Sequence, residues 1–427
     1  MLTALQAVEN LFGAAHDLWS VNLDDDYHEE ITQPSEPAGS LAARGLPRSV
    51  DTIGPRVGGR RWLRRTLPPA LGQPFKSSTN EAGRPTRERQ STSEHREEVV
   101  FPQRWGEPLW RCQSLSMTVA DPVEIFDERM ESIVERGTSV TRLGGDGKWS
   151  EGPVYLPESD SVIWSDIPNN RILEWSATDG SVSTWRRPSN FTNGHTLDNH
   201  GRIVHCSHGA RAVLRTEPDG SVSTLVSHVG SARLNSPNDV VVASDDSIWF
   251  SDPPYGILSD NEGYKADSEL PGCYVFRFEP ATGRLDAVVT DMIYPNGLAF
   301  SPDESILYVS DTSEAPMGEA GRHHVRAYDV VQDGQVPVVA VNSRVFAEIR
   351  PGLPDGFRVD ADGNLYISSL DAIQVFAPDG TRIGRIPVPE RIANCCFGGV
   401  DGHTLFITAS SSLYSIRVGS TEGRRRR

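Results

Sequence analysis

The feature of this sequence that most constrains its fold is a unit of 15 or 16 residues that recurs six times. Each copy has two apolar, β-rich runs around a turn built from Asp, Gly, Pro or Asn, which is the pattern of a β-hairpin. One copy reads NGLAFSPDESILYVSD, and the six copies occupy residues 151–166, 193–208, 238–252, 296–311, 355–369 and 394–409. The repeat therefore predicts an all-β protein assembled from similar units.

The spacing of the copies predicts the architecture. Successive copies begin 42, 45, 58, 59 and 39 residues apart, and one or two further strand-like runs follow most of them. A period of about 40–50 residues with four strands per unit is typical of a β-propeller blade. We therefore expect a six-bladed β-propeller with four-stranded blades and inserted loops in blades three and four. The chain after the sixth hairpin is too short to complete that blade, so residues 121–145 are expected to supply its outer strand and close the ring.

Composition divides the chain into unlike parts. Residues 1–116 are rich in Pro, Gly, Ser and charge, lack a sustained period, and predict a low-complexity, mostly disordered extension. Residues 117–420 are expected to form the propeller, and residues 421–427 a basic tail. The net charge is −17, and residues 117–427 hold 27 of the Lys and Arg residues but 43 of the Asp and Glu residues. Such an acidic surface repels nucleic acid and anionic membranes, so neither is expected as a partner.

The cysteines and the apolar runs bear on the compartment. Five cysteines are too few and too scattered for a disulfide framework and are interpreted as reduced thiols. No apolar run reaches 18 residues, and the first 20 residues lack both a basic leader and a continuous apolar core. We therefore expect a cytoplasmic protein without a membrane span. The sequence does not choose between a monomer and a dimer.

The first residue of every hairpin is polar. The innermost strands of a propeller line a central channel and begin at one rim, so these six side chains are expected to converge there. Carboxylate and amide oxygens are what a hard divalent cation such as calcium requires, and a cation would neutralise the two carboxylates. The alternative is that these residues cap strands or satisfy backbone groups at the channel mouth. The six residues are Glu151, Asn193, Asn238, Asn296, Asp355 and Asn394.

The hairpins and their flanks carry recognisable motifs. They read EGPVY, WSDIPNNRI, RLNSPNDVVV, WFSDPPYGI, YPNGLAFSPDESILYVSDT and PDGFRVDADGNLY. Through them, residues 125–418 resemble the SMP-30/gluconolactonase/luciferin-regenerating family, and the microbial gluconolactonase branch more than the animal regucalcin branch. The resemblance implies a six-bladed propeller that hydrolyses lactones with one catalytic divalent metal.

The same resemblance implies roles for individual residues. Glu151, Asn296 and Asp355 match metal ligands, and Asp355 also matches the proposed general base. Asn238 matches a position that contacts substrate and is a further candidate ligand. Other residues near this rim by motif position are expected to bind the hydroxyls of a sugar lactone: Asp239, Asn193, Arg233 and Tyr255.

Together these observations predict an enzyme of the carboxylic ester hydrolase class. The expected reaction is metal-dependent hydrolysis of a glucono-1,5-lactone-like sugar lactone to the aldonic acid, with Ca²⁺ as the cofactor and Zn²⁺, Mn²⁺ or Mg²⁺ as alternatives. No G-x-S-x-G motif is present, which disfavours a serine esterase of the α/β-hydrolase type. Two alternatives stay open: a non-enzymatic calcium-binding or interaction propeller, and a lactonase for a pentonolactone or a non-sugar lactone. Four histidines between residues 195 and 208 are not expected to bind zinc, because strand alternation separates them.

Overall fold

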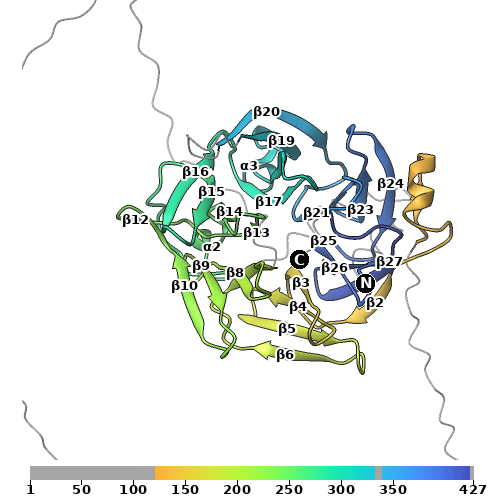
Figure 1. Ribbon diagram of the computed structural model, residues 1–427, viewed down its shortest axis with the longest axis horizontal. Helices are drawn as coiled ribbons and strands as arrows, with labels where there is room; N and C mark the ends of the chain where they lie inside the picture. The colour runs from red at the N-terminus through yellow and green to blue at the C-terminus, as the bar shows by residue number, and fades with distance from the viewer. Residues whose placement is uncertain (1–120, 332–338, 424–427) are drawn as a thin grey trace, which may run out of the picture. The chain divides into compact units, whose positions relative to one another are not determined.

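Six antiparallel sheets surround a central axis in the structure, a computed structural model that describes residues 121–331 and 339–423 (Figure 1). The predicted six-bladed propeller with four-stranded blades is confirmed. The predicted extension at residues 1–116 and the last four residues of the predicted tail lie outside the described residues.

Each of the first four blades is one continuous meander whose innermost strand comes first in the chain. The strands of blade 1 are β3 (Ser150–Leu156), β4 (Ser161–Asp166), β5 (Arg171–Ser176) and β6 (Val182–Arg186). The strands of blade 2 are β7 (Thr192–Leu197), β8 (Ile203–Ser207), β9 (Ala212–Thr216) and β10 (Val222–Val226). The strands of blade 3 are β13 (Val240–Val242), β14 (Ile248–Asp252), β15 (Tyr274–Glu279) and β16 (Arg284–Val289). The strands of blade 4 are β17 (Pro295–Phe300), β18 (Ile306–Asp311), β19 (His324–Val331) and β20 (Val339–Glu348).

The last two blades recruit strands from the start of the described chain. Blade 5 contains β21 (Phe357–Val359), β22 (Leu365–Ile367), β23 (Ala372–Phe376) and β24 (Arg382–Pro387), and blade 6 contains β25 (Ile392–Gly398), β26 (Thr404–Ala409) and β27 (Ser412–Arg417). The outer strand of blade 6 is β2 (Thr141–Gly144), which pairs antiparallel with β27, so the predicted closure of the ring is confirmed. A two-residue strand, β1 (Glu124–Ile125), adds a fifth strand to blade 5, which the sequence did not predict.

Short elements decorate the loops between these strands. The 3-10 helix η1 (Glu128–Ser132) links β1 and β2, and a small hairpin of β11 (His228–Val229) and β12 (Ala232–Arg233) precedes blade 3. The expected inserted loops of blades 3 and 4 carry α2 (Tyr255–Leu258), and α3 (Glu314–Met317) with η2 (Gly318–Ala320). Among the described residues, none of these helices has the length and apolar character needed to cross a membrane.

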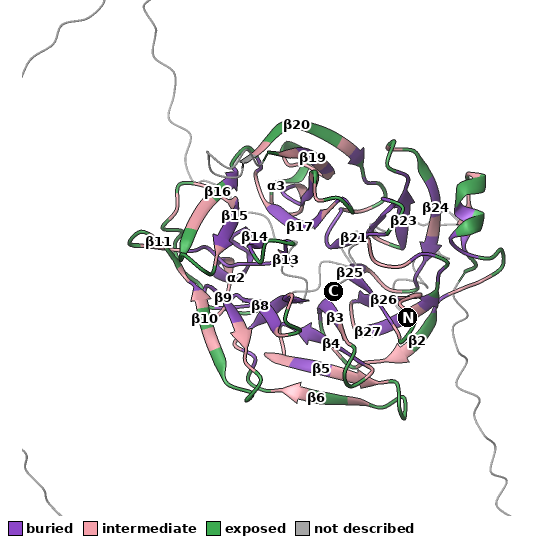
Figure 2. Ribbon diagram, viewed as in Figure 1, coloured by how far each residue is buried: buried purple, intermediate pink, exposed green. Residues whose placement is uncertain are grey.

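Burial decreases from the axis outward (Figure 2). Strands β4, β8 and β23 are buried along their whole length, whereas the outer strands β6 and β10 consist mostly of exposed and half-buried residues. The apolar side chains form a separate cluster at each of the six junctions between neighbouring blades. At the junction of blades 1 and 2, for example, Val154 and Ile163 pack with Leu197 and Ile203. These junctions hold the blades in fixed orientations and so fix the channel.

The C-terminal segment crosses from blade 6 to the innermost strand of blade 5. Ala361 N donates to Thr421 O at 2.9 Å, and Gly423 N donates to Val359 O at 2.9 Å. Asp360 and Glu422 form the bridge between these bonds. The propeller therefore extends to Gly423 rather than to residue 420, because residues 421–423 satisfy backbone groups at the end of β21.

The described cysteines agree with the expectation of reduced thiols. Within the described residues, Cys206, Cys273, Cys395 and Cys396 form no disulfide bond, and three of them are buried. Burial raises the pKa of Cys395 to about 12, so its thiol stays neutral. Cys112 lies outside the described residues.

Candidate active site

The six polar residues that begin the hairpins lie at the same end of the innermost strands. Glu151, Asn193, Asn296 and Asn394 lie within β3, β7, β17 and β25, and Asn238 and Asp355 come two residues before β13 and β21. All six are at most 4% exposed. We refer to these six as the ring residues; they lie at the same end of the innermost strands and are withdrawn from bulk water.

A local irregularity of the strands accompanies this ring. The register of the inner hairpin shifts between Glu151 and Val154 in blade 1 and between Pro295 and Leu298 in blade 4. Equivalent shifts fall between residues 192 and 195 and between residues 392 and 394. A bulge bends its strand and re-aims a side chain that would otherwise follow the pleat. It thus gives the first residue of the hairpin a direction that strand alternation alone does not provide.

Glycine follows the ring residue in four blades because the neighbouring blade approaches too closely for a side chain. A Cβ atom on Gly194 would lie 2.6 Å from Asn238 O, below any normal contact distance. Cβ atoms on Gly152 and Gly297 would clash with the backbone of Asn193 and Asp355, and one on Gly356 with the side chain of Asn394. In these four cases the ring residue of the next blade packs against the glycine, and the polar-Gly pairs of the sequence mark these contacts.

The Ser-Asp pairs that end several hairpins hold the ring residues in place. Ser165 Oγ donates to Asn193 O and Ser310 Oγ donates to Asp355 O, both at 2.8 Å, so each serine anchors the ring residue of the next blade. The following aspartates are fully buried and accept backbone N–H bonds from the loop that leads into their own blade. Their donors are Lys148 N for Asp166, Asn235 N for Asp252 and Ile293 N for Asp311.

Contacts across the channel bring Asn394 and Glu151 of the ring together with Asp239. The Oδ1 atom of Asn394 accepts from Cys395 N at 2.8 Å, which turns its Nδ2 atom toward carboxylates. That Nδ2 lies 3.3 Å from Glu151 Oε2 in the adjacent blade 1 and 3.5 Å from Asp239 Oδ2 in the opposite blade 3. Asn394 is therefore a donor to two carboxylates, a function that suits an orienting residue better than a metal ligand.

Asn296 is oriented by residues that the sequence analysis did not single out for this purpose. Its Nδ2 atom donates to Thr312 Oγ1 at 3.2 Å, and the hydroxyl of Tyr255 contacts the same Oγ1. An amide that donates through Nδ2 on one side presents Oδ1 on the other, as a cation ligand requires. Tyr255 is 1% exposed and its hydroxyl is engaged with Thr312, whereas its contact with substrate stays a prediction.

Asn193 is oriented through a buried histidine. His208 Nδ1 donates to Glu262 O at 3.1 Å, which makes Nε2 the acceptor in the neutral ring. That Nε2 lies 3.4 Å from Asn193 Nδ2. Burial lowers the pKa of His208 to about 4, so the ring is neutral at pH 7 and can accept.

The two other predicted substrate residues have clear protein partners. Asp239 is 1% exposed; its Oδ1 accepts from Val240 N at 2.8 Å, and its Oδ2 lies 3.4 Å from Arg358 Nη1. Arg233 lies in β12, where its Nη2 donates to Ala210 O at 2.7 Å and its backbone N–H donates to Glu269. Arg358 is a residue that sequence reasoning missed, although a lone charge inside a buried strand is a signal for a buried partner.

The chemistry of the ring fits a hard cation. Glu151 and Asp355 supply carboxylates and Asn238 and Asn296 supply amides, which are the oxygen donors that Ca²⁺ and Mg²⁺ prefer. The channel holds three carboxylates, those of Glu151, Asp239 and Asp355. Their three negative charges equal the two positive charges of a divalent cation plus the one of Arg358. Within the described residues, no group of three or more His, Cys, Asp and Glu side chains is arranged to hold a metal ion. The proposed ligands are two carboxylates and two amides, so only Glu151 and Asp355 among them are residues of these types.

Two of the four histidines of blade 2, His195 and His205, are cross-strand partners rather than separated by strand alternation. His195 Nδ1 donates to Gly152 O at 2.7 Å, and its ring packs edge-on against His205 with centroids 5.7 Å apart. Both ring nitrogens of His205 are buried, and neither has a hydrogen-bond partner in the part of the chain that the structure describes. Burial is the main cause that lowers the pKa of His205 well below 6.5. This ring is therefore a source of instability rather than a ligand.

Replacing His205 by the similarly sized Leu is expected to stabilise the protein by roughly 1–3 kcal/mol at neutral pH, because it removes unsatisfied buried polar atoms. The gain should grow below pH 6.5. There the unfolded histidine takes up a proton that the native one refuses, so the parent protein loses stability as the pH falls. Urea unfolding at pH 7.5 and 5.5 measures both effects. His200 is exposed, so His200→Leu is the control and should change neither value; a destabilised His205→Leu protein would contradict the prediction.

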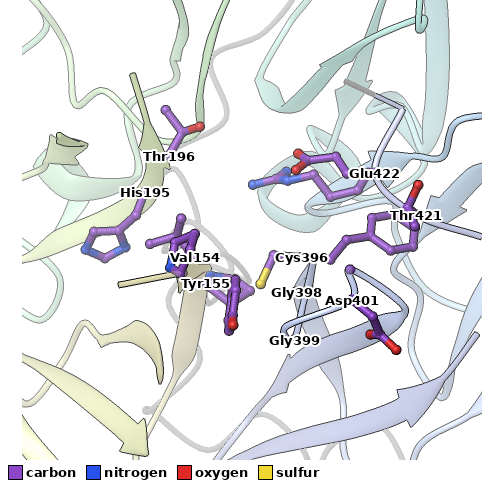
Figure 3. A pocket seen from close by; sticks show the side chains of 15 residues that line it. Val154, Tyr155, His195, Thr196, Cys396, Gly398, Gly399, Asp401, Thr421 and Glu422 are labelled. Carbon is purple, nitrogen blue, oxygen red and sulfur yellow. The ribbon is translucent and has the colours of Figure 1, made fainter. Parts of the chain in front are cut away.

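A cavity of about 400 Å³ lies at the ends of strands β3, β7 and β25 that are farther from the ring residues (Figure 3). Its lining includes Tyr155 and Thr196 from the inner strands and Thr421 and Glu422 from the C-terminal segment. Figure 3 shows Glu422 and Thr196 on opposite sides of it. None of the six ring residues lines this cavity, so it lies at the far end of the channel from the candidate active site.

Comparison with known proteins identifies the family to which this sequence and fold are similar. Residues 149–411 match the model described as the SMP-30/Gluconolactonase/LRE-like region. A gluconolactonase from Zymomonas mobilis is 32% identical over 313 residues, which are 69% of this chain and 85% of that protein. A pentonolactonase from Haloferax volcanii is 24% identical over 61% of this chain and 81% of its own length. A solved gluconolactonase from Xanthomonas campestris superimposes with a TM-score of 0.64 and 38% identity, over 70% of this chain and 95% of that one.

Proposed function

Because this chain belongs to the SMP-30/gluconolactonase/LRE-like family, we propose that it is a lactonase, a carboxylic ester hydrolase that opens a sugar lactone similar to glucono-1,5-lactone to the aldonic acid. The observation that carries the proposal is the buried ring of oxygen donors at one end of the channel. Lactonase relatives that match most of their own length support the reaction class.

We propose that Glu151, Asn238, Asn296 and Asp355 hold one divalent cation, with Ca²⁺ as the first candidate. The chemistry that a bound cation supplies is polarisation of the lactone carbonyl and stabilisation of the negative charge that develops on its oxygen. The protein contributes orientation: Thr312 and Tyr255 turn Asn296, and Asn394 restrains Glu151.

Asp355 is proposed as the general base. Its carboxylate accepts a proton from the attacking water as the new bond to the carbonyl carbon forms. The bond between that carbon and the ring oxygen then breaks, and the proton passes to the ring oxygen, which leaves as a hydroxyl of the aldonic acid. Asn193 and Asn238, which begin the hairpins of blades 2 and 3, are proposed to bind substrate hydroxyls. Arg233 is the weaker candidate because its side chain is engaged with Ala210 O.

A non-enzymatic calcium-binding or interaction propeller is the competing proposal. A scaffold has no need for amides whose orientation is fixed by buried partners, and Asn193, Asn296 and Asn394 are all fixed in this way. Buried positioning of this kind serves chemistry at defined atoms. The enzyme is therefore the better-supported function.

The decisive assay is acid release from glucono-1,5-lactone in weak buffer, measured above the spontaneous rate. A pentonolactone and a non-sugar lactone should be tested beside it, each with Ca²⁺, Mg²⁺, Mn²⁺ and Zn²⁺ in turn. The Asp355→Asn protein, purified in parallel, controls for contaminating lactonases. A parent protein that hydrolyses none of the panel faster than this control would contradict the enzyme proposal and favour the scaffold.

We also propose that the catalytic domain begins after residue 116. A chain shortened to begin at Met117 is expected to fold and to keep full activity. It retains β1, the first described strand of the propeller, and β2, which completes blade 6. Soluble yield and kcat/KM, each compared with the full-length protein, check this. A chain that begins at Gly147 lacks β1 and β2 and is the matched control, expected to be insoluble. Loss of soluble protein on removal of residues 1–116 alone would contradict the boundary.

A further inference from the structure

Arg358 is a buried cation in the wall of the channel. It is the central residue of β21, three positions after Asp355, and it is 7% exposed. Its Nη1 atom donates to Phe357 O at 2.7 Å and lies 3.4 Å from Asp239 Oδ2. A guanidinium cannot lose its charge in a protein, so a permanent positive charge faces the carboxylate of blade 3 from blade 5.

This charge stands between the ring and the far cavity. Arg358 lines both the cavity of about 400 Å³ and a smaller one of about 60 Å³, and Glu422 lines both as well. Above it, the amide of Asn394 connects Asp239 with Glu151. Removal of the guanidinium would take away the cationic partner of the Asp239 carboxylate, beside cavities that the Glu422 side chain also lines. Carboxylate oxygens with water are the ligands that a hard cation prefers.

We infer that the guanidinium of Arg358 neutralises the Asp239 carboxylate in the channel. A second metal ion would otherwise be needed to balance that charge. The inference rests on the proposed function for the one divalent cation at the ring. It makes Arg358 a positioning residue: it keeps the Asp239 carboxylate engaged in the channel wall and restricts the channel to a single divalent ion. A protein without it should accept a second cation, which a merely structural arginine would not control.

The test measures Ca²⁺ stoichiometry by equilibrium dialysis with metal analysis, and the thermal midpoint of the metal-free protein. The parent protein should bind one equivalent of Ca²⁺ and Arg358→Met should bind two. Without metal, Arg358→Met should melt several degrees lower, because an uncompensated buried carboxylate remains, and Ca²⁺ should recover most of that loss. Arg358→Lys keeps the charge and should bind one equivalent.

Two control variants separate charge balance from loss of packing. The double variant Asp239→Asn/Arg358→Met removes both charges and should return to one equivalent and to a higher metal-free midpoint than Arg358→Met alone. Arg277 is 6% exposed and pairs with Asp245 away from the ring, so Arg277→Met should lower the midpoint and leave the stoichiometry at one.

The outcomes distinguish the inference from the function on which it rests. The inference, but not the metal site, would be overturned if Arg358→Met bound one equivalent of Ca²⁺ and its metal-free thermal midpoint were no lower than that of Arg277→Met. A parent protein that binds no Ca²⁺ would overturn the metal site, while the metal-free midpoints of the single and double variants would still test the charge balance. If Arg358→Met does not fold, the other two variants decide. A double variant Asp239→Asn/Arg358→Met that also fails to fold would refute the charge-balancing role of Arg358. An Arg358→Lys protein that binds two equivalents of Ca²⁺ would refute it as well.

Discussion

The Asp355→Asn protein is expected to lose about 10²–10⁴-fold in kcat, and saturating metal is not expected to restore it. Asparagine keeps the size of the side chain and one oxygen donor, so metal binding should weaken but recover at high concentration. An amide cannot accept the proton of the attacking water, so the chemical step should remain slow. The measurement is turnover against metal concentration, extrapolated to saturation.

Two further variants make this result interpretable. Asn296→Ala removes a neutral ligand, so excess metal should rescue much of its rate, and Glu151→Gln should respond similarly. If saturating metal returns Asp355→Asn to near the parent rate, Asp355 is only a ligand and the base lies elsewhere on the rim. Asp239 is then the next carboxylate to test, although its oxygens are already engaged by Val240 N and Arg358.

Much of the fold followed from the sequence because a propeller repeats one local pattern. Each hairpin is a short-range structure set by alternation and turn residues, so six copies predict six blades, and the missing strand predicts closure by residues 121–145. The two-residue strand β1 was not predictable, since so short a segment has no period. Residues 421–423 were assigned to a tail because Arg residues follow them, yet backbone hydrogen bonds to β21 hold them.

The ring was predictable for a different reason. Residues in equivalent positions of a repeat lie at equivalent places around the axis, so the register of the first residues was enough to bring them together. The sequence did not contain the orientation of their side chains. That depends on bulges and on partners distant in the chain, such as Thr312 for Asn296 and His208 for Asn193.

The positioning residues were missed because pairwise contacts between blades have no fixed sequence spacing. Asp239 and Arg358 are 119 residues apart, and Asn394 and Asp239 are 155 apart. Motif position placed Asp239 and Tyr255 near the rim, but motif position alone does not say whether a side chain meets the substrate or another protein group. The structure directs both toward neighbours in the protein, which is why the proposed substrate contacts now centre on Asn193 and Asn238.

Removal of divalent metal is expected to abolish lactonase activity and to lower the thermal midpoint. Without a cation, Glu151 and Asp355 leave negative charge in a site that is at least 96% buried, and Arg358 balances only one carboxylate. A ligand that binds only the native state stabilises it by about 2.7 kcal/mol when present at 100 times its Kd, so both turnover and stability should return together on titration with Ca²⁺.

The measurement is turnover and thermal midpoint after exhaustive dialysis against chelator, followed by addition of Ca²⁺, Mg²⁺, Mn²⁺ or Zn²⁺ separately. The Glu151→Gln/Asp355→Asn double variant is the matched control. It keeps the size of the ring but removes two charges, so its midpoint should respond little to chelator or to metal. If the parent protein turns over lactone at an unchanged rate while metal analysis finds no bound divalent metal, the ring is not a catalytic metal site. The six polar residues would then serve to cap strands and satisfy backbone groups at the channel mouth, which is the alternative that their residue types also allow.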